Sequence, residues 1–195
     1  METLKQTFTA FSGSDRITTG DIKDVATEVK EHLKKETRTT VLIFNDLTGE
    51  QVDIDLRGTA ESLAKRLEGL FPSEEAEAEV VKGPGRPKLG VVPREVTLLP
   101  AQWDWLSRQP GGASVTLRKL VEEARKKNFA KDQIRMSQDA TYKFMHVMAG
   151  DLPNYEEALR ALYAKDKEKF AKQISGWPKD VRDHAKKLAK SAFAD

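Results

Sequence analysis

The segment KGPGRPKLG places three basic side chains in a stretch rich in glycine and proline. Gly85 and Pro87 favour a narrow, extended backbone, so the Arg86 side chain between them can enter a confined and negatively charged space. The minor groove of A·T-rich DNA is such a space, and Lys82 and Lys88 can then reach the flanking phosphates. The segment therefore predicts a DNA contact, although a flexible hinge between domains explains the same composition.

Catalytic and metal-binding patterns are missing from the rest of the sequence. There are no cysteines, which excludes disulfides, thiolate catalysis and cysteine-based zinc sites. The histidines, His32, His146 and His184, are not spaced to hold a metal from one helix, and we expect surface or packing roles for them. Asp53 and Asp55 alternate along one predicted strand, where a solvated face accounts for them. We expect no catalytic residues, no metal, no cofactor and no enzyme activity.

The net charge of +2 hides an uneven distribution along the chain. Residues 1–81 carry 10 Lys and Arg against 17 Asp and Glu, whereas residues 82–131 carry 11 against 4. Residues 132–195 are nearly balanced, with 12 against 10. The basic middle segment indicates an anionic partner, and a solvated charged face is the alternative.

Residues 1–71 have the pattern of a small N-terminal α/β sandwich-like domain. Asp21 is placed to cap a helix whose apolar positions recur every three or four residues, and Thr59 is placed to cap a second helix. Four β-prone runs are expected as strands: 7–11, 16–18, 39–46 and 51–56. The last two of these runs flank a glycine-containing turn and predict a hairpin.

The remainder of the chain divides into a linker and two further parts. Residues 72–93 lack periodicity and are rich in proline, glycine and charge, which is typical of a linker. Residues 94–130 contain one β-prone run and two helices, and residues 131–195 read as an all-helical C-terminal segment. The expected helices are 101–109, 114–127, 137–150, 154–166, 167–176 and 178–193. The predicted fold class is therefore α+β.

The middle part, residues 94–130, resembles the ribbon-helix-helix family of DNA-binding proteins. The resemblance rests on VTLLPAQWDWL followed by GGASVTLRKLVEEA, in which Pro100 opens one helix, Gly111 and Gly112 make a break, and Ser114 begins the next helix. A strand of about five residues needs ladder partners that this part does not supply. The resemblance implies an obligate homodimer in which two copies of the strand form an antiparallel ribbon in the DNA major groove.

The resemblance also implies which side chains meet DNA. If Val96 and Leu98 face the dimer core, then Glu95, Thr97 and Leu99 face outward, and the first two can reach base edges. The second helix, which we expect Ser114 to cap, offers backbone N–H groups to a phosphate. The expected DNA-binding residues are Lys82, Gly85, Arg86, Pro87, Lys88, Arg94, Glu95, Thr97, Ser114, Arg118 and Lys119.

Two further resemblances involve the linker and the whole chain. The sequence PGRPK resembles an AT-hook core, and an arm in the minor groove leading into a major-groove reader is an established geometry. Nearly the full length, including MAGDLPNYEEALRALYAKD and DVRDHAKKLA, resembles a bacterial family of unknown function. That resemblance implies a bacterial cytoplasmic protein and supplies no activity.

We therefore expect a dimeric DNA-binding protein, either a transcriptional regulator or a nucleoid-associated factor. No apolar run approaches 18 residues and no secretory signal begins the chain, so we expect a cytoplasmic location and no membrane partner. An antitoxin-like module that binds a protein partner is one alternative. Others are an enzyme with an unrecognised site in the N-terminal domain, and a monomer whose strand 94–99 pairs with the N-terminal sheet.

Overall fold

The computed structural model describes residues 6–36, 39–71 and 91–194. The chain divides into two compact units, the first combining Met1–Pro72 with Lys131–Asp195 and the second being Ser73–Ala130. The N-terminal domain and the C-terminal helical segment, which the sequence pattern separates, thus belong to one unit. No helix in the described residues is both long and apolar enough to cross a membrane.

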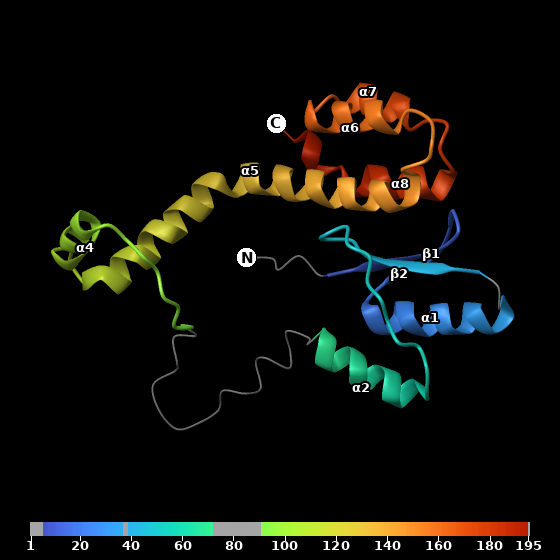
Figure 1. Ribbon diagram of the computed structural model, residues 1–195, viewed down its shortest axis with the longest axis horizontal. Helices are drawn as coiled ribbons and strands as arrows, with labels where there is room; N and C mark the ends of the chain where they lie inside the picture. Colours follow the sequence, from blue (N-terminus) through green and yellow to red (C-terminus); the bar gives the residue numbers. More distant parts are fainter. Residues whose placement is uncertain (1–5, 37–38, 72–90, 195) are drawn as a thin grey trace. The chain divides into compact units, whose positions relative to one another are not determined.

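A three-stranded antiparallel sheet near the N-terminus, followed mostly by helices, confirms the α+β fold class (Figure 1). The elements in chain order are β1 (Phe8–Ser12), β2 (Asp15–Gly20), α1 (Ile22–Lys35), β3 (Val41–Asn45), α2 (Ala60–Leu70), α4 (Pro100–Ser107), α5 (Gly112–Ala149), α6 (Tyr155–Tyr163), α7 (Lys167–Gln173), α8 (Lys179–Leu188) and a 3-10 turn (Ser191–Phe193).

The sheet of the first unit has the strand order β2–β1–β3 and separates two apolar cores. Successive side chains of a strand point to opposite faces, so Phe8 and Ala10 of β1 enter one core and Phe11 enters the other. In β3, Ile43 and Phe44 divide in the same way. Both faces of the sheet are therefore covered within this unit.

Helices α1 and α2 cover the first face of the sheet. The buried side of α1 repeats at helical spacing, which is the pattern that the sequence predicted. The core residues contributed by these two helices are Ile22, Val25, Ala26, Val29, Leu63 and Leu67. Asp21 caps α1 by accepting hydrogen bonds from the backbone N–H of Lys23 and Asp24, and Thr59 caps α2 by accepting from Ser62. Both predicted helix starts are confirmed.

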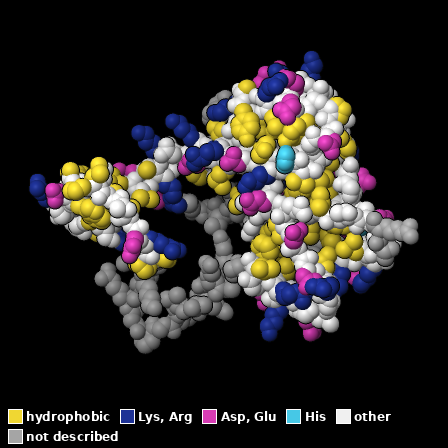
Figure 2. All heavy atoms as spheres, viewed as in Figure 1, with side chains coloured by type: hydrophobic (Ala, Val, Ile, Leu, Met, Phe, Trp, Pro, Cys, Tyr) yellow, Lys and Arg dark blue, Asp and Glu magenta, His cyan; other side chains and the backbone are white. Residues whose placement is uncertain are grey.

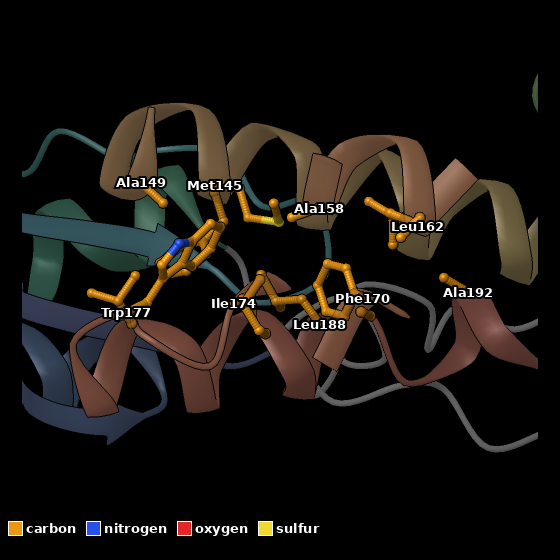
Figure 3. Packing of buried hydrophobic residues seen from close by; sticks show 14 of the residues in the cluster. Met145, Ala149, Ala158, Leu162, Phe170, Ile174, Trp177, Leu188 and Ala192 are labelled. Carbon is orange, nitrogen blue, oxygen red and sulfur yellow. The ribbon is translucent and has the colours of Figure 1, made fainter. Parts of the chain in front are cut away.

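The second core lies between the sheet and the C-terminal helices. Phe11 and Phe44 from the sheet meet Phe144 of α5, with ring centroids 5.5 Å and 5.0 Å from it. Figure 3 shows how α5 packs with the later helices through interleaved large and small side chains. The Trp177 indole donates to the carbonyl of Pro153 at 2.8 Å, which satisfies its only polar atom inside this core.

The hairpin predicted after β3 forms only at its closed end, and its second strand is wrong. Residues 51–56 make one isolated bridge, between Phe44 and Gln51, and the backbone N–H of Val52 donates to Ile43 at 2.8 Å. Beyond this point they form no strand. Their apolar side chains, Val52, Ile54 and Leu56, nevertheless pack against the first core. The alternating pattern therefore positions the side chains without extending the ladder of backbone hydrogen bonds.

The break predicted between the helices 114–127 and 137–150 is also wrong, because both belong to one continuous helix, α5, which runs from Gly112 to Ala149. The residues between the two predictions, NFAKDQIRM (128–136), include neither proline nor glycine, so nothing in them ends a helix.

Candidate functional sites

Five of the expected DNA-binding residues lie outside the described residues: Lys82, Gly85, Arg86, Pro87 and Lys88. The AT-hook-like segment therefore stays a prediction. The other six, in the second unit, have described positions.

The strand predicted at 94–99 is not a strand in the single chain. Among the residues that the structure describes, none pairs with it, and Arg94, Glu95 and Thr97 are exposed. Strand geometry is stabilised by neighbouring backbone groups, and an isolated segment of this length has none. Within the segment 94–99, only Leu98 is partly buried, and the other residues are exposed.

The helix-break-helix that follows keeps the expected order with a shifted boundary. Pro100 is the first residue of α4, and two glycines with positive φ angles lead into α5: Gly111 (86°) in the turn and Gly112 (74°) as the first helical residue. Glycine adopts this conformation without the steric cost that other residues meet. Because α5 begins at Gly112, the prediction that Ser114 caps it is wrong. The Ser114 hydroxyl lies in the first turn and accepts from Arg118 at 3.3 Å.

An apolar groove lies on the side of this unit where the two helices meet. The groove has a volume of about 400 Å³ and is lined by Leu98, Ala101, Gln102, Trp105, Leu106, Leu117 and Leu120. Leu106 is buried at its base, but Trp105 is 50% exposed and Leu120 is 43% exposed. Figure 2 shows hydrophobic side chains gathered on the surface around α4. The unit by itself leaves much of its apolar surface in water.

Basic side chains stand near the start of α5. Arg118 and Lys119 are exposed and make no ion pair with a described residue, whereas Glu122 pairs with Arg125 at 3.0 Å and with Lys126 at 3.9 Å. The structure thus brings Ser114, Arg118 and Lys119 together on consecutive turns of one helix. Among the described residues, no hydrogen bond or ion pair joins Ser114, Arg118 or Lys119 to residues 94–97.

The first unit holds a buried polar cluster that the sequence reasoning missed. Asp46 follows β3, and its side chain is only 6% exposed. Its Oδ2 atom accepts from Thr7 and from the Lys187 ammonium, both at 2.7 Å, and its Oδ1 atom accepts from Thr9 at 2.8 Å. The Nε2 atom of His184 lies 3.4 Å from Oδ1. Only the spacing of His184 and Lys187 on one face of a helix hinted at this cluster.

The charges in this cluster are set by burial and by hydrogen bonds. Burial opposes ionisation of Asp46, but the hydrogen bonds from Lys187, Thr7 and Thr9 outweigh it and lower the pKa of the carboxyl. Burial lowers the pKa of His184 to about 4, against the attraction of Asp46. The imidazole is therefore neutral at pH 7 and packs edge-on against Phe11 and Phe144, which agrees with the expected packing role.

Lowering the pH should destabilise the fold through His184. Its pKa is about 4 in the folded protein and about 6.5 when unfolded, so the unfolded state binds the proton more readily. The contribution of neutral His184 to the free energy of unfolding is fully present above about pH 6.5. It falls by up to about 3 kcal/mol as the pH drops to 4. Urea unfolding measured between pH 7.5 and 4.5 should show this loss. A His184→Leu variant should flatten the curve, while His146→Gln, at an exposed position, should leave it unchanged; equal curves for all three proteins would contradict the assignment.

No metal site accompanies the cluster. Within the described part of the chain, no three His, Cys, Asp or Glu side chains are grouped so that they could hold a metal ion.

Comparison with known proteins places the chain in a family. A family of uncharacterized proteins conserved in bacteria, DUF2239, matches residues 7–189, which is nearly the whole chain. No curated protein and no solved structure matches it. The match confirms the resemblance to a bacterial family of unknown function, and it covers both compact units. The chain belongs to the DUF2239 family.

Proposed function

We propose that this chain is a dimeric DNA-binding protein, acting as a transcriptional regulator or a nucleoid-associated factor. The observation that carries the proposal is the open apolar groove beside the segment 94–99, which has no strand partner among the described residues. A second copy of the chain would account for both features, because it would cover the groove and pair with the segment.

The second copy would cover the groove and complete the ribbon. Trp105, Leu117 and Leu120 line the groove, and removing such side chains from water is favourable by roughly 25 cal/mol per Å² of apolar surface. Residues 94–99 of the two copies would pair antiparallel about a two-fold axis, which satisfies backbone groups that one copy leaves open. Leu98 already lines the groove, as an inward-facing ribbon residue must.

DNA would contact the outer side of this dimer. With Leu98 inward, the alternation of a strand places Glu95, Thr97 and Leu99 outward, toward the major groove. Backbone N–H groups in the first turn of α5 would meet the phosphates, together with Arg118 and Lys119, which make no ion pair with a described residue. Arg86 would enter the adjoining minor groove.

The test is binding of the pure protein to A·T-rich and G·C-rich duplexes across a salt series, beside its mass in solution. A dimer whose affinity falls steeply with salt and is higher for A·T-rich DNA supports the proposal. Arg86→Ala should remove the A·T preference. A monomer that binds neither duplex at low salt would overturn it, and copurification of a small protein at the groove would favour the antitoxin-like alternative.

The contact from Arg118 predicts a specific change in salt dependence. Arg118→Ala should weaken binding to all sequences alike and reduce the slope of log K against log salt by about 1. Arg135→Ala is the matched control, because Arg135 is an exposed arginine on the same helix that pairs with Asp132 at 2.9 Å. If both variants change the slope equally, Arg118 is not a phosphate contact.

A further inference from the structure

A cavity in the first unit opens beside the buried Asp46. Its volume is about 230 Å³, and its walls come from four segments: the start of β1, the turn after β3, α5, and the end of α8 with the 3-10 turn. All its lining residues belong to the first unit, and none of them lines the groove or is an expected DNA contact. Its walls are thus held by the central sheet and by two helices packed on it.

The polar side of this cavity has unused hydrogen-bond donors. The Lys187 ammonium carries three N–H groups, of which Asp46 takes one, and its side chain is 47% exposed. The amide of Gln133 and the hydroxyl of Ser191 also line the cavity, and neither has a hydrogen-bond partner among the described residues. All three groups could donate to an incoming acceptor.

Asp46 itself is not available to a ligand. Three hydrogen bonds, from Thr7, Thr9 and Lys187, already occupy its oxygens, and His184 adjoins Oδ1. A cation or an ammonium group would therefore find at most one of the roughly four acceptor sites of this carboxylate open, and that site lies beside the His184 ring. The arrangement favours a ligand that accepts hydrogen bonds and carries negative charge, because Lys187 can bind it while keeping its bond to Asp46.

The opposite side of the cavity is apolar. Leu47, Met136, Ala140 and Leu188 line it, and Met136 is 41% exposed. Methionine adapts its shape to a bound apolar group more readily than branched side chains do. A ligand that pairs with Lys187 could cover this surface with its hydrocarbon part.

We infer that this cavity binds a small organic acid, with the carboxylate on Lys187 and a short apolar body against Met136 and Leu188. A volume of about 230 Å³ holds several waters, so the cavity has room for a short-chain organic acid and not only for a single ion. A six-carbon carboxylic acid is of this size. The inference does not rest on the proposed function, since it concerns a different unit of the chain.

The test is calorimetric titration of the full-length protein with acetate, butanoate, hexanoate and octanoate at pH 7. Affinity should rise at least tenfold from acetate to hexanoate and should stop rising at octanoate, because the cavity is then full. Hexanamide, which has the same shape without the charge, should bind at least tenfold more weakly than hexanoate. Absence of saturable binding by every acid up to 10 mM would overturn the inference.

Variants at adjacent lysines locate the site. Lys187→Met should weaken hexanoate binding at least tenfold, whereas Lys186→Met, which removes an equal charge outside the cavity, should leave it unchanged. Lys187→Arg keeps the charge and the bond to Asp46, so it should retain binding within about threefold even if the Met variant folds poorly. If Lys186→Met and Lys187→Met weaken binding equally, the acid binds elsewhere. DNA binding measured in parallel keeps the two proposals separate, since either can fail while the other holds.

Discussion

Replacing Gly49 by alanine should destabilise the first unit by more than about 3 kcal/mol. Gly49 has a φ of +69° in the turn after β3, where its N–H donates to the carbonyl of Asn45 at 2.8 Å. A Cβ atom at this position would lie 1.9 Å from the carbonyl oxygen of Ala140, and Cβ contacts under 3.0 Å essentially never occur. Because that oxygen belongs to the backbone of α5, the turn and the helix would have to separate.

Gly13→Ala is the matched control for this clash. Gly13 also has a positive φ, of +57°, in the turn between β1 and β2, but a Cβ there meets nothing within 4 Å. Gly13→Ala should therefore lower the free energy of unfolding only by the strain of the left-handed backbone conformation, about 1–2 kcal/mol. Urea unfolding monitored by circular dichroism measures the free energy of unfolding of both variants. Similar losses would show that the turn at Gly49 does not pack against α5 as described.

Replacing Leu120 by glutamate should dissociate the proposed dimer and reduce DNA affinity at least 100-fold at constant salt. In the single chain this side chain is 43% exposed, so a charge there is compatible with folding of the monomer. In the dimer the groove is covered, and an unpaired carboxylate inside it would lose its hydration. Two copies carry the change, so its effect on association is doubled by symmetry.

Val147→Glu is the control for Leu120→Glu. Val147 is similarly exposed, at 46%, but it belongs to the first unit and does not line the groove. It should leave both the dimer and the DNA affinity near their original values. Sedimentation equilibrium and a fluorescence-anisotropy titration measure the two properties. A Leu120→Glu variant that remains a dimer would rule out the groove as the interface between copies.

Several local features follow directly from the order of residues along the chain. The caps at Asp21 and Thr59 were predictable because each is a hydrogen bond between residues two or three positions apart. The break at Gly111 and Gly112 was predictable because only glycine adopts those φ angles without strain. Both features depend only on residues close together in the chain, so they can be predicted without the tertiary structure.

Whether a β-prone run becomes a strand depends on a neighbouring strand, which the local sequence does not specify. The run 41–45 became β3 because β1 lies beside it, whereas 51–56 and 94–99, with equally β-prone composition, have no full ladder within the described chain. A strand forms only when neighbouring backbone groups complete its hydrogen bonds. For 94–99 we propose that those groups come from a second copy.

By itself the sequence determined the α+β class, most helices with their apolar faces, and the position of the break between α4 and α5. Only the tertiary structure joined residues 1–72 with 131–195 in one unit and brought Asp46 within 2.7 Å of Lys187, 141 positions later in the chain. In the sequence these two residues look like ordinary surface charges. Their pairing, and the cavity beside them, arise only when the sheet and α8 pack together. The burial of Asp46 depends on this packing, and no single segment of the sequence specifies it.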